Sequence, residues 1–268
     1  MPLTLTPLPG IPYIRQGDDL AEILLPALNT AHITLEDNDI LVLAQKIVSK
    51  AEGRMVNLAT ITPSNRAGEL AAQAEKDARL VELVLRESNE VLRVRPGVII
   101  VEHKLGFICA NAGIDHSNVG RSNDSSHYSP AAELAATNAE DYVLLLPEDP
   151  DKSAKEIRTK IGSKTGKKLG VMIIDSHGRT WRLGTAGVCI GLSGIPALVD
   201  ERGWKDLFGY TLSVTVVGVA DELAAAASLV MGQAAEGTPV VHVRGFPYPL
   251  REGSLKELIR PKDQDLFR

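Results

Sequence analysis

The sequence predicts a fold of the α/β or α+β class. Short apolar runs, most of them rich in aliphatic or β-branched residues, alternate along the chain with amphipathic segments. The chain has 268 residues, of which 44% are hydrophobic and 24% are charged, so it can bury a large core without disulfides. At about 150 residues per domain, this length fits one large domain or two closely associated subdomains.

The predicted elements follow from these runs. Apolar runs that are short, and mostly bounded by turn residues, are predicted as strands at residues 39–44, 97–101, 105–110, 142–146, 170–174, 212–219 and 239–243. Amphipathic segments are predicted as helices at residues 18–25, 66–87, 152–161 and 220–233. The last helix begins with Asp221 and Glu222, acids that suit a helix N-terminus.

Polar and glycine-rich segments between these elements are predicted as turns or loops. Residues 117–130 are rich in Ser, Asn and Asp, and residues 162–168 are a short basic stretch. Residues 184–194 are rich in glycine, which lets a backbone approach another backbone or a ligand closely. For this third segment, a tight packing turn and a binding loop both remain open. A subdomain boundary fits best near residues 147–150.

Composition disfavours several classes of protein. The net charge of −5 is poor for a dedicated nucleic-acid binder. Cys109 and Cys189 are too few for a disulfide framework, and they fit reduced thiols in a cytoplasmic protein. The N-terminus lacks a basic segment followed by an apolar run, and residues 185–199 are too broken by glycine and proline to span a membrane. We expect a cytoplasmic protein with no nucleic acid and no membrane as partner.

Familiar catalytic signatures are absent from the sequence. Residues 162–168 (GSKTGKK) have too few residues between their glycines for a P-loop, and neither Ser nor Thr follows the Gly-Lys pair. Residues 191–194 (GLSG) lack the spacing of a nucleophile elbow, and the six histidines show no zinc-ligand spacing. No G-x-G-x-x-G follows a strand. Serine hydrolases, zinc hydrolases and standard dinucleotide enzymes are therefore disfavoured.

Two carboxylates follow predicted strands directly. Asp115 comes after the glycine turn that ends the strand at 105–110, and Asp175 comes after the strand at 170–174, with Ser176 beside it. Strand ends line the crevices in which α/β sheets bind ligands. Carboxylate and hydroxyl oxygens suit a hard cation such as Mg²⁺ or Mn²⁺. The alternative is that both aspartates only cap turns.

Basic side chains flank these acids, and in chain order they are Lys46, Lys50, Arg179 and Arg182. Lys and Arg bind phosphate or carboxylate groups, although a solvated surface is the commoner place for any single lysine. Residues 231–238 end the last predicted helix. They form either a glycine C-cap and turn, or a nucleotide-holding loop with Gln233 as an oxygen ligand.

Taken together, the motifs resemble one family over nearly the whole chain. The matching blocks are PLPGIP (7–12), VLAQKIVSKAEGR (42–54), NAGIDHSNV (111–119), LLPEDPDKSA (145–154), IIDSHGRTWRLGTAGVCIGLSGI (173–195), DLFG (206–209) and VADELAAAASLVMGQAAEGTPVVHVRG (219–245). Several of these blocks are long, and they occur in order. The chain thereby resembles the coenzyme F420-0:L-glutamate ligases, the gamma-glutamyl ligases of deazaflavin cofactor biosynthesis.

The resemblance implies a fold and a reaction. The fold is α+β, with two intimately associated mixed α/β subdomains, no P-loop and an intertwined homodimer. One catalytic domain is expected over residues 1–268, without the C-terminal flavin-binding domain that some relatives carry. The reaction is the GTP-dependent addition of L-glutamate to the lactyl carboxylate of coenzyme F420-0, then of a gamma-linked glutamate. We hypothesise an acyl-phosphate intermediate, with GDP and phosphate as products.

The resemblance also implies the ligands of the site. Two divalent cations, Mn²⁺ or Mg²⁺, are expected, with K⁺ assisting. Asp115 and Asp175 match ligands of one cation, and Ser176 and Gln233 match ligands of the other. Gln233 stands where an acid can occur in the family, and Ser176 stands where threonine is common. The positions that match GTP contacts are Pro9, Gly10, Ile11, Pro12, Gln45, Lys46, Lys50, Asn118, Met231, Gly232, Gln233, Ala234, Ala235, Glu236, Gly237 and Thr238.

Some roles stay open at the level of sequence. No side chain is an obvious general base, and Lys50, Arg179 and Arg182 are the candidates for stabilising the transferring phosphate. Two other functions also remain. One is the same ligase chemistry on another anionic acceptor. The other is a non-catalytic GTP-binding protein, which predicts nucleotide binding without glutamate-dependent release of phosphate.

Overall fold

The computed structural model describes residues 2–119 and 142–266, and the chain forms two units. Unit 1 comprises Met1–Pro12, Asp19–Gln45 and Asp149–Asp265, and unit 2 comprises Tyr13–Asp18, Lys46–Glu148 and Leu266–Arg268. Each unit combines helices with its own β-structure, so the fold is mixed α+β.

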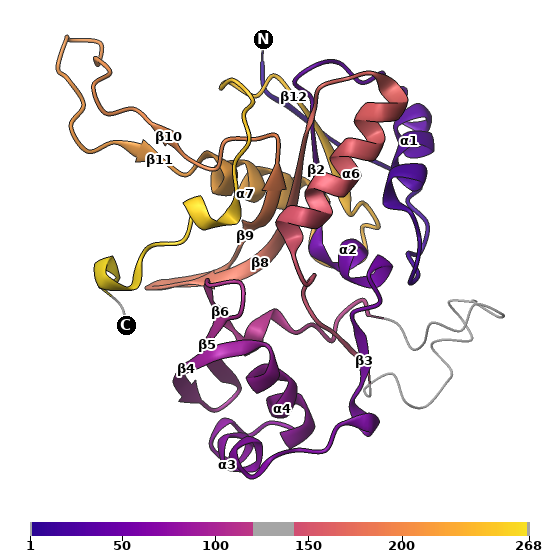
Figure 1. Cartoon of the computed structure of the whole chain (residues 1–268), viewed down its shortest axis with the longest axis vertical. Coiled ribbons are helices and arrows are strands. Elements are labelled where there is room, and N and C mark those ends of the chain that lie inside the picture. The colour runs from indigo at the N-terminus through magenta and orange to yellow at the C-terminus, as the bar shows by residue number, and fades with distance from the viewer. Residues whose placement is uncertain (1, 120–141, 267–268) are drawn as a thin grey trace. The chain divides into compact units, whose positions relative to one another are not determined.

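Unit 1 is built on a five-stranded sheet with the strand order β1-β12-β2-β8-β9 (Figure 1). β2 and β8 run parallel, and the other neighbouring strands are antiparallel. β2, β12 and the first half of β8 are buried on both faces, which explains their continuous apolar runs in the sequence. The strand bounds are β1 (Thr4–Pro7), β2 (Ile40–Ala44), β8 (Gly170–Arg179), β9 (Arg182–Ser193) and β12 (Val240–Arg244).

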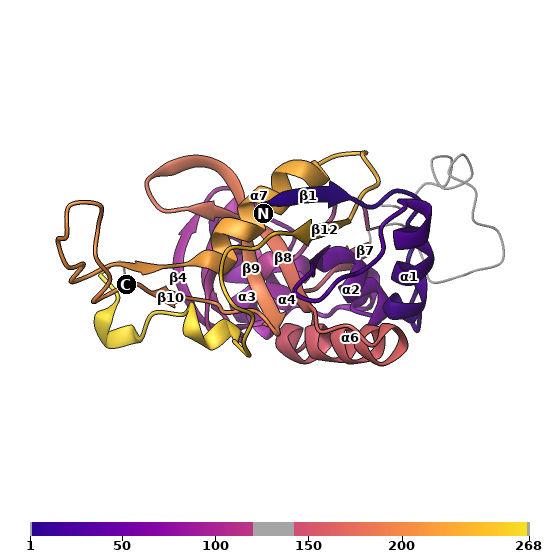
Figure 2. The same cartoon turned by 90° about the horizontal axis from the view of Figure 1, so that it is seen from above.

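Helices cover both faces of this sheet (Figure 2). α7 (Val219–Met231) packs its alanine-rich side against one face, together with core residues such as Val42 and Ile174. α6 (Pro150–Thr165) covers the other face and contacts α1 (Leu20–Thr30). Asp19 and Asp149 cap the N-termini of α1 and α6 by accepting backbone N–H groups.

The glycine-rich segment 184–194 belongs to strand β9, so the expectation of a turn or a loop there is wrong. A Cβ atom on Gly187 would collide with the backbone of Ala224 in α7, and one on Gly191 would collide with Pro150 of α6. The glycines therefore let two helices approach one strand closely, one on each face of the sheet.

An arm follows β9 in unit 1, formed by β10 (Val199–Asp200), β11 (Val216–Val217) and the residues between them. Figure 1 shows it extending away from the sheet of its own unit. Strand structure at 212–219 is limited to β11, because α7 already starts at Val219. Two short 3-10 helices, Leu255–Glu257 and Lys262–Gln264, complete unit 1.

Unit 2 contains two small antiparallel sheets with helices beside them. One core brings α3, α4 and β5 together through Ala67, Ala71, Val81, Val84 and Ile99. The strands are β3 (Met55–Asn57), β4 (Ser88–Arg95), β5 (Val98–His103), β6 (Ile108–Ala110) and β7 (Tyr142–Leu144). The helices are α2 (Gln45–Ala51), which starts at the unit boundary, α3 (Asn65–Ala74), α4 (Ala78–Arg86), and the 3-10 helices Leu58–Thr60 and Asn111–Gly113.

The single helix predicted for residues 66–87 is wrong, because the chain breaks it into α3 and α4. Glu75 ends α3 in the left-handed conformation, with φ of 52°, and Asp77 caps α4 by accepting the N–H of Arg79. The strand predicted at 105–110 shortens to β6, because Gly106 takes a turn with φ of 95°. Of the loop predicted at 117–130, residues 120–130 lie outside the described part of the chain.

The other predicted strands and helices are confirmed with shifted ends. β1, β3, β4 and α2 were not predicted. No helix in the described ranges is long and apolar enough to cross a membrane. Cys109 and Cys189 are buried free thiols, and burial raises the pKa of Cys189 well above its usual value.

Candidate functional site

The predicted residues of unit 1 gather at one end of its sheet. β2 and β8 stay paired as far as Ala44 and Ile174, so Gln45 and Asp175 follow at the same level. The N–H of Ala44 donates to the carbonyl of Pro239 (2.8 Å), which brings in the loop before β12. The N–H of Leu8 donates to the carbonyl of Val240 (2.8 Å), which brings in the loop after β1. We call this the Asp175 end of the sheet.

Asp175 and Ser176 lie inside β8, whereas the sequence predicted that both follow the strand. The prediction failed because β8 continues beyond β2 as a hairpin with β9, in which Asp175 pairs with Val188 and Ser176 with Gly187. Asp175 and Ser176 still lie at the carboxyl end of the parallel pair β2 and β8. This is the end where open α/β sheets bind ligands.

Alternation along β8 sends the two side chains to opposite faces. Asp175 shares its face with His177, and the Nε2 atom of His177 lies 3.0 Å from the Oδ2 atom of Asp175. Both side chains are nearly buried, with exposed fractions of 12% for His177 and 13% for Asp175. Ser176 continues the face of Met172 and Ile174, which packs against α7.

Ser176 meets the end of α7 on that second face. Its Oγ atom donates to Oε1 of Gln233 (3.0 Å), and Nε2 of Gln233 donates to Oγ of Ser228 (2.9 Å). Ser228 is a buried residue of α7. Because Ser228 accepts from the amide nitrogen, the amide oxygen of Gln233 is directed to Ser176.

The segment 231–238 is a C-cap and turn, which was one of its two interpretations. Gly232 caps α7 with φ of 76°, and the hydroxyl of Thr238 donates to the carbonyl of Met231 (3.2 Å). The carboxylate of Glu236 accepts the N–H of Ala234 (2.8 Å), and backbone N–H donation lowers its pKa. The nucleotide-holding role of the same segment stays a prediction.

The remaining predicted GTP contacts of unit 1 lie at the same end. Pro9 to Pro12 form the loop after β1, with Pro9, Gly10 and Pro12 exposed and Gly10 at a φ of 73°. Gln45 is buried at the junction of β2 and α2.

Unit 2 gathers the other predicted residues around α2. The Nζ atom of Lys46 lies 2.6 Å from Oδ2 of Asp115, and the Nζ atom of Lys50 donates to the carbonyl of Asn118 (2.7 Å). Lys46 and Lys50 are one helical turn apart, so both reach the segment 115–118 from one side of α2. The backbone of Asp115 pairs with that of Leu144, the last residue of β7.

The donor set fits the expected cations by its chemistry. The predicted ligands offer carboxylate, hydroxyl and amide oxygens, which are the donors that Mg²⁺ and Mn²⁺ prefer. Within residues 2–119 and 142–266, no three His, Cys, Asp or Glu side chains gather closely enough to hold a metal ion.

Arg179 and Arg182 lie at the tip of the β8–β9 hairpin, where they pair with each other and are exposed. A guanidinium nitrogen of Arg179 donates to the carbonyl of Leu183 (3.3 Å). Arg179 lies four residues beyond Asp175, a distance of roughly 13 Å along β8. Their roles toward the phosphate stay predictions.

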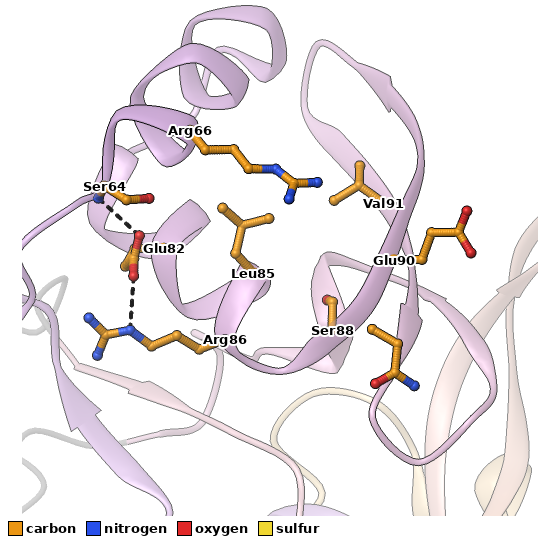
Figure 3. A pocket seen from close by; sticks show the side chains of 9 residues that line it. Ser64, Arg66, Glu82, Leu85, Arg86, Ser88, Glu90 and Val91 are labelled. Atoms are coloured by element: carbon orange, nitrogen blue, oxygen red, sulfur yellow. Dashed lines mark hydrogen bonds and ion pairs between the residues drawn. The ribbon is translucent and has the colours of Figure 1, made fainter.

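A pocket in unit 2 lies apart from the predicted residues of that unit (Figure 3). Its volume is about 280 Å³, and α3, α4 and β4 line it. The carboxylate of Glu82 already accepts the N–H of Ser64 (3.0 Å) and the side chain of Arg86 (3.0 Å). The pocket contains none of the residues predicted for the site, so it is not the candidate active site.

Sequence reasoning missed His177 and Ser228. Their contacts exist only in the folded chain. His177 contacts Asp175 because β8 extends past Asp175, and Ser228 contacts Gln233 because α7 ends beside β8. The one available signal for His177 was the alternation of side chains along a strand, which places residues 175 and 177 on the same face.

The oxygen donors among the predicted residues, the lysines of α2 and the lack of a P-loop in the sequence set the chain apart from the P-loop proteins. Comparison with known proteins gives the family. Residues 10–245 match the family model described as F420-0:Gamma-glutamyl ligase. The chain belongs to this family, and it is an enzyme of the ligase class.

Full-length relatives support the assignment. The chain is 48% identical to the coenzyme F420:L-glutamate ligase of a Methanococcus maripaludis strain, over 96% of this chain and 94% of the relative. It is 44% identical to the enzyme of the same name from Methanothermobacter thermautotrophicus, with all of both chains covered. The enzyme of that name from Archaeoglobus fulgidus is 43% identical over 98% of this chain and 95% of its own.

Proposed function

We propose that the protein is a GTP-dependent ligase that adds L-glutamate to coenzyme F420-0. The first glutamate is joined through its α-amine to the lactyl carboxylate, and the next through the gamma-carboxylate of the first. The observation that carries this proposal is the match to relatives named coenzyme F420:L-glutamate ligase along essentially the whole chain. The position of Asp175, Ser176 and Gln233 at the Asp175 end of the unit 1 sheet supports it.

A carboxylate does not react with an amine at neutral pH, so the acceptor must first be activated. The acceptor carboxylate oxygen attacks the γ-phosphorus of GTP, and the bond to the β-phosphate oxygen breaks, releasing GDP. The amine of glutamate then attacks the acyl carbon of the acyl phosphate and loses a proton. Inorganic phosphate leaves with one oxygen from the acceptor. Atoms and charge balance without a redox partner.

The protein's part in this scheme is to bind and orient. Asp115, Asp175, Ser176 and Gln233 would hold two divalent cations, which neutralise phosphate charge when bound. Lys46 and Lys50 place two positive charges beside Asp115 and Asn118. K⁺ is proposed to assist. The residue that stabilises the transferring phosphoryl group is Lys50, Arg179 or Arg182.

We also propose a homodimer. On the arm, Leu207 is 98% exposed and Phe208 is 94% exposed, and Trp181 and Leu183 are exposed at the tip of the β8–β9 hairpin. Large apolar side chains left in water at neighbouring positions are typical of association surfaces. Sedimentation should give a dimer for wild type and a monomer for Leu207→Glu combined with Phe208→Glu. A monomeric wild type, or a dimeric variant, contradicts this proposal.

Oxygen-18 transfer tests the reaction. Coenzyme F420-0 labelled with ¹⁸O in its lactyl carboxylate is incubated with protein, GTP, L-glutamate and Mn²⁺. We expect the phosphate released in the first glutamyl addition to carry one ¹⁸O, phosphate from any second addition to be unlabelled, and release to require glutamate. Wholly unlabelled phosphate alongside a product with a single glutamate contradicts the acyl phosphate. Phosphate release without glutamate, or GTP binding without any release, contradicts the ligase and favours a GTP-binding protein.

A further inference from the structure

We propose that His177 is a positioning residue that fixes the carboxylate of Asp175 for divalent-cation binding. The proposal rests on the proposed function, because it takes Asp175 as a cation ligand. Nothing in the sequence pattern or in the relatives' names assigns a role to His177.

The geometry of β8 brings the two side chains together. Residues two apart on a strand point to the same face, and here the Nε2 atom of His177 lies 3.0 Å from Oδ2 of Asp175. An ionised carboxylate only accepts hydrogen bonds, so Nε2 is the donor. β9 pairs with both positions, through Val188 and Ala186, so the backbone that carries the two side chains is held in register.

Burial makes this hydrogen bond effective as a constraint. With exposed fractions of 12% and 13%, neither side chain is well placed to exchange its partner for bulk water. A free aspartate rotates about two side-chain torsions, and binding a cation must stop that rotation. A hydrogen bond that already fixes one carboxylate oxygen lowers this cost. The carboxylate has about four lone-pair sites, and the hydrogen bond from Nε2 uses one of them.

The same geometry argues against Nε2 of His177 as a direct ligand. A histidine binds a metal through an unprotonated nitrogen. While Nε2 donates to Asp175, that nitrogen has no lone pair for a cation, and only Nδ1 keeps one. In the proposal His177 acts through Asp175, as hydrogen-bonding partners of metal-ligating carboxylates commonly do.

The test is Mn²⁺ affinity of the full chain without nucleotide, measured by the electron paramagnetic resonance signal of free Mn²⁺. His177→Gln keeps a nitrogen donor close to the position of Nε2, whereas His177→Asn carries its amide too close to the backbone to reach Asp175. We expect His177→Asn to weaken Mn²⁺ binding about tenfold. His177→Gln should stay within about threefold of wild type.

A matched control is His242→Gln. His242 also contacts an aspartate of unit 1 through Nε2, at 2.9 Å from Oδ2 of Asp39, but at the other end of the sheet. We expect its Mn²⁺ affinity to be that of wild type. Wild-type affinity in His177→Asn, or equal weakening in His177→Gln and His177→Asn, would overturn the proposal.

Two further measurements separate the possible failures. If Asp175→Asn loses Mn²⁺ binding while His177→Asn keeps it, the positioning role fails alone. If Asp175→Asn binds Mn²⁺ as tightly as wild type, the ligand assignment fails, and the positioning role with it. Should His177→Asn not fold, electron spin echo spectroscopy of Mn²⁺ bound to wild type and to His177→Gln tests the proposal. We expect wild type to show no signal of a directly coordinated histidine nitrogen that is lost in His177→Gln. Such a signal would overturn the proposal.

Discussion

Unit 1 contains two aspartate–histidine pairs at opposite ends of the same parallel strand pair. Asp39 precedes β2 and contacts His242 of β12, whereas Asp175 lies in β8 just past the end of β2 and contacts His177. The distances between the histidine Nε2 and the aspartate Oδ2 atoms are similar, at 2.9 Å for His242 and Asp39 and 3.0 Å for His177 and Asp175. Their surroundings differ, and the difference separates a structural pair from a candidate functional one.

The Asp39 carboxylate is saturated with donors. Nε of Arg244 donates to Oδ1 (2.9 Å), while its NH2 nitrogen (2.7 Å) and the N–H of Glu36 (2.8 Å) donate to Oδ2. The side chain of Asp39 is 1% exposed and that of His242 is 5% exposed. Burial alone would raise the pKa of Asp39, but the bonds from Arg244 and the nearby His242 hold that pKa well below its usual range. This pair ties strands together and has no room for a ligand.

The Asp175 pair lies within the β8–β9 hairpin instead. The loops after β1 and before β12, together with Gln45, occur at its end of the sheet. Sheet position therefore makes this pair the candidate for function, because parallel strands open onto ligands at their carboxyl ends.

The largest effect on stability is expected for Asp39→Ala. Its removal leaves Arg244 and His242 without their common anion, so we expect a loss of about 3 kcal/mol, measured by urea unfolding. Glu36→Ala, which removes an exposed partner of Arg244, should lose less than about 1 kcal/mol. A loss for Asp39→Ala no larger than that for Glu36→Ala would refute the structural role of the pair.

The stabilisation that Asp39 provides should also be visible in how the free energy of unfolding depends on pH. Because the folded pKa of Asp39 is lowered, its stabilisation is present at neutral pH. It is lost as pH falls below the unfolded value of about 3.9 toward the folded one. The free energy of unfolding of wild type should therefore drop more steeply below about pH 4 than that of Asp39→Asn. Parallel curves would show that Asp39 does not contribute this dependence.

Asp175→Asn should act on turnover rather than on stability. The change removes a negative charge at the proposed cation site and keeps the side-chain volume, so we expect kcat to fall about a hundredfold or more. Thermal unfolding should stay close to wild type. Asp200→Asn, an exposed carboxylate of the arm, is the control and should leave kcat unchanged. Near-normal kcat in Asp175→Asn at all Mn²⁺ concentrations would exclude Asp175 as a ligand.

Gly187→Ala tests how closely α7 must approach β9 behind the Asp175 end. The new methyl group would meet the backbone of Ala224, so we expect a loss of about 1–3 kcal/mol in chemical unfolding. Gly178→Ala, on the same hairpin, meets no atom within 4 Å and should be nearly neutral. If the two variants were equally stable, the close packing of α7 would have no energetic weight.

Ser228→Ala should have the smallest effect. Gln233 would lose the acceptor that orients its amide, and one hydrogen bond corresponds to about threefold in Mn²⁺ affinity. Ser163→Ala, whose hydroxyl donates to a carbonyl within α6, should leave that affinity unchanged. Affinity equal to wild type in Ser228→Ala would show that Gln233 needs no orientation, or that it is no ligand.

The sequence predicted the buried strands best. β2, β8 and β12 are continuous apolar runs, because helices cover both faces of their sheet. β9 was missed, since its glycines serve helix packing and its first residues are exposed. α2 is short, and β4 is largely exposed, so neither shows a clear apolar period. The break at Glu75 depends on one left-handed residue within an otherwise helical pattern.

The candidate site was predictable as a set of residue types but not as an arrangement. Asp115, Asp175, Ser176 and Gln233 are oxygen donors that motifs can identify. The grouping of Asp175, Ser176 and Gln233 at one end of the unit 1 sheet depends on strand register and on where α7 ends. The register of β12 against β2 in the same sheet joins segments nearly 200 residues apart in the chain. His177 and Ser228 lie inside matching blocks of the sequence, but no role was predicted for either of them. They matter through contacts that exist only once β8 and α7 are in place.

The most direct test of the account is mass spectrometry of coenzyme F420-0 after incubation with the protein, GTP, L-glutamate and Mn²⁺. Wild type and folded Asp39→Asn should give products heavier by one or more glutamyl units, and only when GTP is present. Asp175→Asn should give little or none. No mass gain with wild type, or equal gain with Asp175→Asn, would contradict the assignment of function to the Asp175 end of the sheet.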